Sequence, residues 1–506
     1  MKQIPAIIFK QLLKGDFHDH PDYAGLFFNG DPKRLVFQNC VFQEDITFKE
    51  DLICEFEIEF RSCKFIKHLR IENGTFLDIS FFGTEFSQST NFTIIDGSFK
   101  NISFDNSCKF LGHFNIHSGR FEKVRISNSE FSNSVSFVNG NFHNIEVSGN
   151  TKIANLFFRR GNYRLIRING GEMNELHFSG GNFNNIMLYG LVVVQTIYIS
   201  KGVISHLLLA AVNVAQLIAK DFEKSGSLSI AKLIVNQMGK LDALFLGFKI
   251  SEIHFSDAFL HKDSILRFQN VEVETLNFVD FICFGQLGFS NLSIQKQMNI
   301  TNSDLGKASF ISSSIENIIL NLENSRITDV FFSNTAFPSR VSDDDFQQRL
   351  TYAQIKKINE AKGDYLESNR FYALEMEAFY KTITWKENFW EKLNLWMNKV
   401  SNFHGQSWMV GLRFLVGCVC FFYVSYIFAL GFRIGSLGSR NDWGVFFKVL
   451  SFIFEFTNPV HKSEEIAKGL GASPTVVARV LEGFSRIAIG YGIYQMVQAF
   501  RKHGKK

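Results

Sequence analysis

The residues best suited to binding chemistry lie in two neighbouring basic segments of the sequence. Arginine and lysine bind phosphate oxygens and aromatic rings stack on bases, so their alternation is typical of sites for single-stranded nucleic acid. The competing interpretation is a solvated charged face, which Glu146 between the two segments would help to balance. The candidate binding residues are Arg120, Lys123 and Arg125 in RFEKVRI, and Phe157, Arg159, Arg160, Tyr163, Arg164 and Arg167 in FFRRGNYRLIRI.

A second group of charges lies in an otherwise apolar stretch near the C-terminus. Arg479, Glu482 and Arg486 are separated by three and four residues, which places them on one face of a helix. Charges inside a bilayer are costly unless they face water or a partner, so we expect this face to line a pore or to pair between subunits. The alternative is an ionic network that only locks an oligomer together.

No residue pattern predicts catalysis or a resident cofactor. The P-loop, the dinucleotide-binding glycines, G-x-S-x-G and H-E-x-x-H are all missing from the sequence. The nearest approach to a metal cluster is FHDHPDY, but polar residues in one terminal segment are more often solvated than metal-bound. Its four polar residues are His18, Asp19, His20 and Asp22. We therefore expect a protein that is not an enzyme and that holds neither a metal nor a cofactor.

Composition narrows the class of protein further. A net charge of +4 over 506 residues is too small for a strong long-range field, so only local basic clusters can argue for a nucleic-acid partner. The seven cysteines are scattered without paired metal-ligand spacing, which fits reduced thiols. The apolar run at the N-terminus is too short and interrupted for a secretory signal, so we expect the first domain on the cytoplasmic side.

Phenylalanine occurs 58 times and marks a repeat. Between Phe65 and Phe142, successive repeat phenylalanines are separated by 10 to 13 residues. Each unit continues with alternating apolar residues and then Asn, Ser or Gly, a pattern that predicts a short strand and a corner. The repeat phenylalanines are Phe65, Phe76, Phe86, Phe99, Phe110, Phe121, Phe131 and Phe142.

One such unit cannot bury its own apolar side, but two units per coil, stacked on similar neighbours, form a continuous core. We therefore predict a β-solenoid (β-helix) over residues 35–340, with residues 1–34 as its N-terminal cap. The run LLLAAVNVAQLIA, 13 residues from position 207, is too short to cross a bilayer and is kept in the solenoid. Arg125 and Arg167 are 42 residues apart, which equals two coils, so both should point outward on the same face.

A helical region follows the repeat. The segment SDDD at residue 342 is typical of a helix N-cap, and apolar residues at helical spacing then predict two helices separated at Gly363. A stretch rich in Trp and Lys, from Trp385 to Trp396, suits a helix that lies against lipid headgroups. We interpret residues 341–404 as a helical neck that ends in an interfacial helix.

Residues 405–506 have the pattern of a two-helix transmembrane domain. Met409 to Phe432 is a run of 24 residues with one charge, long enough to cross a bilayer. A second expected span runs from Thr475 to Phe500, and between the spans Trp443 to Phe456 is apolar but too short to cross. Span, short re-entrant helix and span is the order of two-transmembrane pore-loop ion channels, which this region resembles in order and length.

The potassium-channel signature T-x-G-Y-G is missing after the short helix, where the chain has FTNPV, so potassium selectivity is not predicted. Basic residues after the second span favour a cytoplasmic C-terminus, and an even number of spans puts the N-terminus on the same side. One hairpin cannot enclose a conduit, so a channel requires a homo-oligomer. The resemblance to pore-loop channels implies a tetramer. The basic residues are Arg501, Lys502, Lys505 and Lys506.

The coils resemble pentapeptide-repeat β-helices, in which Phe or Leu fills the interior, although this repeat is looser than A(D/N)LXX. The order of a cytoplasmic repeat domain, a helical neck and a two-span channel is similar to the membrane effector of Hailong anti-phage defence. That resemblance implies a channel in the inner membrane of a bacterium, controlled by single-stranded DNA oligomers that a partner nucleotidyltransferase makes. The solenoid would then be the DNA-binding crown, and its basic cluster a candidate oligomer site.

Two functions follow as expectations. The first is a ligand-gated oligomeric ion channel that acts as an anti-phage effector, with its cytoplasmic domain binding single-stranded DNA or another oligonucleotide. The second is a membrane-anchored solenoid scaffold that binds a protein partner and conducts no ions. Conductance separates these two functions.

Overall fold

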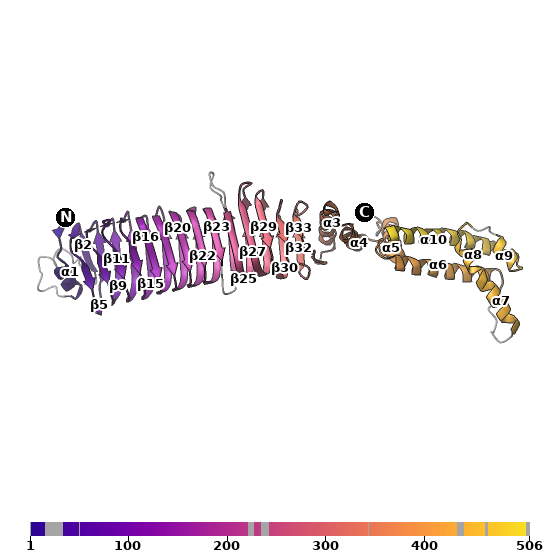
Figure 1. Cartoon of the computed structure of the whole chain (residues 1–506), viewed down its shortest axis with the longest axis horizontal. Coiled ribbons are helices and arrows are strands. Elements are labelled where there is room, and N and C mark those ends of the chain that lie inside the picture. The colour runs from indigo at the N-terminus through magenta and orange to yellow at the C-terminus, as the bar shows by residue number, and fades with distance from the viewer. Residues whose placement is uncertain are drawn as a thin grey trace. The chain divides into compact units, whose positions relative to one another are not determined.

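The chain divides into a strand-rich unit and a helical unit, Met1–Val341 and Ser342–Lys506, and each is described by itself. Figure 1 shows the stacked strands of the first unit and the helices of the second. The computed structural model describes residues 2–15, 34–49, 51–220, 227–233, 242–342, 344–432, 440–460 and 464–501.

The first unit is a β-solenoid of about 13 turns, which confirms the predicted fold of this region. From Arg34 onward, paired residues in neighbouring coils of the described chain are parallel and 20 to 26 residues apart, as in Ile153↔Met173 and Gln216↔Asp242. Two phenylalanine-centred units therefore make one coil. At a strand spacing of about 4.8 Å, this unit extends for roughly 60 Å along its stacking direction.

The strands of the described residues follow the chain from one coil to the next. The first are β1 Lys2–Gln3, β2 Arg34–Gln38, β3 Cys40–Phe42, β4 Ile46–Phe48, β5 Leu52–Cys54, β6 Glu57–Arg61, β7 Lys64–Phe65, β8 Leu69–Ile71, β9 Gly74–Phe82, β10 Glu85–Phe86, β11 Phe92–Ile94, β12 Ser98–Asp105, β13 Lys109–Phe110 and β14 Phe114–Ile116. The middle ones are β15 Arg120–Ser127, β16 Glu130–Val138, β17 Asn141–Ser148, β18 Lys152–Arg159, β19 Asn162–Asn169, β20 Glu172–Ser179, β21 Asn182–Tyr189, β22 Val192–Ser200 and β23 Val203–Lys220. The last are β24 Ser227–Leu233, β25 Asp242–Ser256, β26 Phe259–Leu260, β27 Ile265–Val279, β28 Ile282–Cys283, β29 Gln286–Ser290, β30 Ser293–Thr301, β31 Ser309–Ile311, β32 Ile319–Glu323, β33 Phe331–Ser333 and β34 Arg340–Val341.

Each middle coil has two strands, and each strand bends once. Strands β15, β17, β19 and β21 stack on one another, and so do β16, β18, β20 and β22. In β17 the buried residues are Phe142, Ile145 and Val147, whereas His143 is exposed and Glu146 is half-buried. The strict alternation of a flat strand is broken after His143, so each strand covers two faces of the coil.

Aromatic rings stack through the core with the spacing of the coils. The ring centroids of Phe86 and Phe110 are 3.9 Å apart, and those of Phe121 and Phe142 are 5.0 Å apart. Such stacked pairs add about 0.5–1.5 kcal/mol each beyond the burial of apolar area. The two longest columns are Phe76, Phe99, Phe121, Phe142, Tyr163, Phe183, and Phe42, Phe65, Phe86, Phe110, Phe131.

A short helix covers the first coil. Helix α1, Ala6–Leu13, places Phe9 in the core, where its ring lies 5.1 Å from Phe37 and 5.2 Å from Phe42. An uncovered end of a solenoid presents unpaired strand edges and apolar rings, and both invite association with other chains. The helix therefore forms part of the N-terminal cap. The remaining predicted cap residues, 16–33, lie outside the described residues.

The apolar run from residue 207 is a strand and not a membrane helix. It lies in β23, which pairs in parallel with both β21 and β22. Leu207, Leu209 and Leu217 are buried in the solenoid core. The prediction that this run stays in the solenoid is confirmed.

A column of glycines forms one corner of the coil. Gly119 has φ +114°, and a Cβ atom at this position would lie 2.6 Å from the carbonyl oxygen of Gly97 in the preceding coil. Any side chain there would strike the neighbouring backbone, so only glycine allows coils to stack closely at this corner. The corner is occupied in successive coils by Gly74, Gly97, Gly119, Gly140, Gly161, Gly181 and Gly202.

The second unit contains the predicted helices. Asp344 caps the first of them by accepting a hydrogen bond from the Gln347 amide, and the helix ends at Gly363, which has φ +77°. The expected break between two neck helices is therefore confirmed. The helices are α3 Asp345–Lys362, α4 Tyr365–Thr382, α5 Phe389–Asn402, α6 Trp408–Ala429, α7 Arg440–Ser451, α8 Ile453–Thr457, α9 Glu465–Gly469 and α10 Val476–Arg501.

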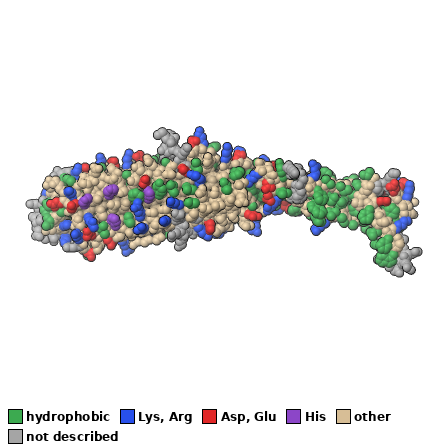
Figure 2. Space-filling model, viewed as in Figure 1, with side chains coloured by type: hydrophobic (Ala, Val, Ile, Leu, Met, Phe, Trp, Pro, Cys, Tyr) green, Lys and Arg blue, Asp and Glu red, His purple; other side chains and the backbone are tan. Residues whose placement is uncertain are grey.

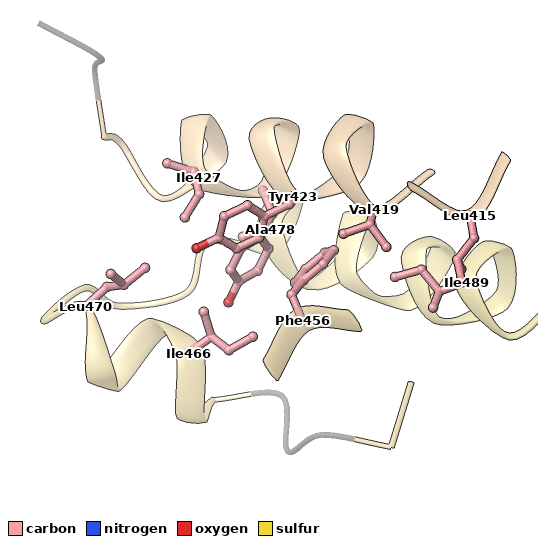
Figure 3. Packing of buried hydrophobic residues seen from close by; sticks show 10 residues of the cluster. Leu415, Val419, Tyr423, Ile427, Phe456, Ile466, Leu470, Ala478 and Ile489 are labelled. Carbon is pink, nitrogen blue, oxygen red and sulfur yellow. The ribbon is translucent and has the colours of Figure 1, made fainter. Parts of the chain in front are cut away.

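Helices α6 and α10 form an antiparallel hairpin. A Cβ atom on Gly411 would lie 3.1 Å from the Met496 Cα atom, and one on Gly492 would lie 3.2 Å from the Leu415 side chain. These contacts run in opposite directions along the two helices, and the two glycines let the backbones approach closely. Figure 3 shows the packing between them, with Phe456 of α8 inserted among side chains of α6 and α10.

We predict that Gly119→Ala will weaken the solenoid, because the left-handed φ and the contact with Gly97 both oppose a Cβ atom. The strain should cost on the order of 1–3 kcal/mol, visible as faster hydrogen exchange in β12, β15 and β17 of the full-length protein. The matched control is Gly83→Asn. Gly83 has φ +54°, close to the φ of Ser62 and Asn106 at the same corner of adjacent coils. Equal exchange in both variants would contradict this account.

Candidate functional site

A shallow groove of about 1080 Å³ runs along the outside of the solenoid over β15, β17, β19, β21 and β23. Its lining residues occupy equivalent positions in successive coils, so the same surface is repeated along the stacking direction. Two residues of the predicted cluster, Arg120 and Arg164, lie in this groove with exposed side chains. Much of the remaining lining is polar, from Glu122, Asn141, His143, Asn162, Asn182 and Asn184.

Hydrogen bonds between coils fix the side chains of the groove. Asn162 Nδ2 donates to Asn141 Oδ1 at 2.8 Å, and Asn182 Nδ2 donates to Asn162 Oδ1 at 2.9 Å. Arg164 Nη1 lies 3.3 Å from His143 Nε2, and since a guanidinium only donates, the imidazole nitrogen is the acceptor. The groove therefore presents ordered amides and guanidinium groups, which suit a ligand with several oxygen acceptors.

The next column of basic residues is partly neutralised by carboxylates. Strand register places Arg125, Glu146 and Arg167 in one column, which confirms that the two arginines point to the same face. Arg125 Nε lies 3.7 Å from Asp105 Oδ1, and Lys123 Nζ lies 3.5 Å from Glu146 Oε2. Burial raises the pKa of Asp105 above its usual value, and the charge of Arg125 opposes that rise. Anionic ligands must compete with these carboxylates.

Phe157 begins an aromatic ladder on the strands of the other side of the coil. Its ring centroid lies 4.7 Å from that of His177, whose ring lies 4.6 Å from Tyr198 in the following coil. Stacking between neighbours leaves mainly the ring edges accessible along the ladder. The outer ring face of Phe157 is approached by Arg159, whose guanidinium carbon lies 4.3 Å from the ring centroid. This pair is a cation–π contact that a base could join only by displacing the arginine.

Tyr163 is placed in the interior of the solenoid. Only 1% of the residue is exposed, and its ring stacks between Phe142 and Phe183 at 5.0 and 4.9 Å. The hydroxyl group donates to the Phe137 carbonyl oxygen at 2.8 Å. Its surroundings explain this position, because Tyr163 takes the place that phenylalanine has in neighbouring coils. We therefore leave Tyr163 out of the proposed ligand surface.

The predicted basic cluster is thus divided between faces that meet at a corner. Arg160, with φ +51°, forms the turn between β18 and β19, so Arg159 and Arg160 lie between the aromatic ladder and the groove. On the face seen in Figure 2, Lys and Arg side chains are spread over the solenoid rather than gathered in one dense patch. The surface is better described as a groove and a ladder joined by two arginines.

The charges predicted for the second span occupy different environments. Glu482 is 2% exposed, and its Oε1 atom accepts a hydrogen bond from Arg486 Nη2 at 2.9 Å. Arg479 is exposed, on a different side of α10 from the buried face that packs on α6. Ala478 and Ile489 on the same face as Glu482 belong to the core shared with α6. The structure therefore brings Glu482 and Arg486 together and separates Arg479 from them.

The outer surface of the hairpin is apolar. The exposed fractions of Phe421 and Phe428 in α6 are 67% and 53%, and those of Phe484 and Ile487 in α10 are 60% and 72%. Figure 2 shows hydrophobic side chains gathered on the helical unit. Among the described residues, only α6 is long and apolar enough to cross a membrane by length and composition. Helix α10 lies where the second span was expected but does not meet that condition, so the two-helix transmembrane domain stays a prediction.

The short apolar segment between the expected spans is helical and packs on the hairpin. Helices α7 and α8 cover most of it, and the Tyr423 hydroxyl of α6 donates a hydrogen bond to the Val449 carbonyl oxygen of α7. Phe456 is fully buried against Tyr423 and Tyr426. A re-entrant position in a membrane stays a prediction for this segment.

Comparison with known proteins gave no match: no protein-family model, no curated protein and no solved structure is significantly similar to this chain. Within the described residues, no group of three or more His, Cys, Asp or Glu side chains is arranged to hold a metal ion. His18, Asp19, His20 and Asp22 lie outside the described residues. The function must therefore be argued from the surfaces described above.

We predict that Arg164→Gln will weaken binding of a fluorescent single-stranded oligonucleotide to the full-length protein. Loss of one phosphate contact should reduce affinity by roughly fivefold and lower the slope of binding against salt by about one. Asp105→Asn should have the opposite effect, because it frees Arg125. Lys307→Gln, an exposed position away from the groove, is the control. Unchanged affinity in the first two variants would argue against this surface.

Proposed function

We propose that the protein is a ligand-controlled oligomeric ion channel, in which the α6–α10 hairpin crosses a membrane and the solenoid binds the controlling ligand. The observation that supports this most strongly is the contrast within the hairpin. Glu482 and Arg486 pair inside it, whereas the exposed side chains around them are largely apolar. Soluble monomers rarely expose a large continuous apolar surface, and lipid or neighbouring copies would cover this one.

The dimensions of the hairpin suit a bilayer. Helix α6 has 22 residues and α10 has 26. At about 1.5 Å per residue they extend for roughly 33 and 39 Å, against about 30 Å for the hydrocarbon core. A charged group within such a span is tolerated when it is paired and turned away from lipid. Glu482 meets both conditions through Arg486 and its position against α6.

Several copies would be needed to enclose a conduit. One hairpin has no interior wide enough for ions, so copies must surround a common axis. Exposed Arg479 would then face either that axis or a neighbouring copy, because a charge facing lipid is unfavourable. Four copies is the number that the resemblance to two-span channels implies. Both termini would be cytoplasmic in this multi-pass arrangement, with Arg501 at the cytoplasmic end of α10.

The solenoid groove supports a ligand with repeated anionic groups. Arg120 and Arg164 stand two coils apart along the groove, with amides between them. Arg159 and Arg160 extend this surface toward the aromatic ladder. A single-stranded DNA oligomer supplied by a partner nucleotidyltransferase has this chemistry, and it is the ligand that the anti-phage resemblance implies. The biological role that follows is an effector in the bacterial inner membrane.

The second candidate function is a membrane-anchored scaffold without conductance. Glu482 is buried within its own hairpin, so its pair with Arg486 can serve only to hold α6 and α10 together. In that case the solenoid would bind a protein partner and the hairpin would only keep it at the membrane. The position of Arg479 separates the two functions, because an anchor has no use for a charge on a conducting axis.

The test is ion flux through the full-length protein in liposomes. A channel should pass ions, and Arg479→Gln should alter the ratio of cation to anion flux because it removes a positive charge from the conduit. Lys307→Gln in the solenoid is the matched control and should leave that ratio unchanged. No flux in any protein, with or without an added single-stranded oligonucleotide, would reject the channel and favour the scaffold.

Insertion of α6 can be tested with its own cysteine. Cys420 is exposed in the isolated chain, whereas Cys40, Cys54, Cys63, Cys108 and Cys283 are buried in the solenoid. We predict that a membrane-impermeant maleimide will not label Cys420 in liposomes until the protein is denatured. Lys307→Cys should be labelled at once, which shows that the reagent reaches the protein. Rapid labelling of Cys420 in intact liposomes would contradict membrane insertion.

A further inference from the structure

A cluster of buried polar side chains joins α5 to α10. Asn402, at the end of α5, is 1% exposed, and Gln495 in α10 is 3% exposed. Asn402 Nδ2 donates to Gln495 Oε1 and lies 3.3 Å from the Gln495 carbonyl oxygen. In return, Gln495 Nε2 donates to Asn398 Oδ1 at 3.1 Å, and the Tyr491 hydroxyl lies 3.5 Å from the same atom. Each amide is therefore held by groups on the other helix.

The linker between α5 and α6 is strained where this cluster holds it. Phe403 and His404 have φ values of +53° and +55°, in a region that bulky residues avoid, and Gly405 follows at +81°. Such conformations persist only when the surroundings impose them. Asn402 does so here, because its Oδ1 atom accepts a hydrogen bond from the Gly405 amide at 2.8 Å. One side chain thus fixes the linker and binds α10.

A buried nitrogen adds to the cost of this linker conformation. His404 is 7% exposed, and its Nε2 atom has no hydrogen-bond partner among the described residues. Burial lowers the pKa of His404 below its usual value, with nearby Glu377 opposing and Lys399 adding to that shift. An unpaired buried polar group is unfavourable, so it must be retained by stronger neighbouring interactions. The linker would relax if the contact between α5 and α10 were released.

Helix α5 is also tied to the neck. Lys399 Nζ forms an ion pair with Glu377 Oε1 of α4 at 2.5 Å. Gln406 Nε2, in the linker, donates to the Asn369 carbonyl oxygen of α4 at 2.5 Å. Helix α5 therefore contacts the neck through one set of polar groups and α10 through another. A displacement of α4 would reach α10 through these contacts.

We propose that the amide contact of Asn398 and Asn402 with Gln495 is a releasable latch that couples the neck to the channel helix α10. This inference rests on the proposed channel function. In the latched state α5 holds the C-terminal half of α10, and the strained linker favours release. Release would let α10 move with respect to α5 and change the conduction of the pore. Amide pairs suit this role because their hydrogen bonds are directional and can be replaced by water.

The first experiment measures gating of the full-length protein in a lipid bilayer. Gln495→Met keeps the side-chain length but removes both hydrogen-bonding groups, and it should change the ratio of open to closed time by roughly tenfold. Exchanging the amides, with Asn402→Gln and Gln495→Asn together, should restore a ratio near that of the natural protein. The matched control is Gln498→Met, one turn along α10, where the contact with Asn402 is long at 3.5 Å. It should change the ratio by less than about twofold.

The second experiment measures hydrogen exchange of the same proteins in nanodiscs and does not need conduction. Gln495→Met should speed exchange of the linker amides of residues 403–407 by roughly tenfold and leave the middle of α6 and α10 unchanged. If the linker responds so but no protein conducts, the latch stands and the channel function fails. If the channel conducts while gating and linker exchange are unchanged, the latch is overturned. Faster exchange throughout α6 and α10 would also overturn it, since it would show a purely structural role.

Discussion

Placement of charge in apolar surroundings is the constraint on which the functional account depends. Glu482 is almost completely buried in a hairpin whose outer surface is apolar, and Arg486 pairs with it one turn along the same helix. In water, a hairpin with this surface would associate with itself or with lipid, because the cost of exposing it is large. In a bilayer, the same pair turns an unfavourable charge away from lipid. Exposed Arg479 is the charge that still needs a neighbour or water.

The solenoid meets a different demand, which is to present a repeated surface that does not depend on one local loop. Each coil hydrogen-bonds to the next and stacks its rings on them, so residues 20 or 21 apart occupy equivalent positions, as Arg120, Asn141 and Asn162 do. A groove can then extend over several coils with a constant backbone. Substitution along such a groove changes its chemistry without changing its shape. The variation from Arg120 to the asparagine ladder is an example.

The sequence predicted the features that depend on local spacing. The coil length, the phenylalanine core, the helix break at Gly363 and the column of Arg125 and Arg167 follow from periodicity. Residues were harder to place where the chain turns: Phe157 and Arg164 fall on different faces because a corner separates their strands. The spacing G-x-F in GRFEKV and GNFHNI could have revealed the glycine corner. The contact of Asn402 with Gln495 joins residues 93 apart, so no local pattern could indicate it.

Counting copies of the full-length protein in lipid tests the central claim most directly. If the hairpin is a membrane segment that assembles around a conduit, each nanodisc should hold several copies, and mass photometry should give a multiple of the chain mass. The complex should also leave the aqueous fraction when lipid is removed. A single copy per nanodisc, or a monomer that stays in water without lipid or detergent, would contradict the assembly that the channel requires.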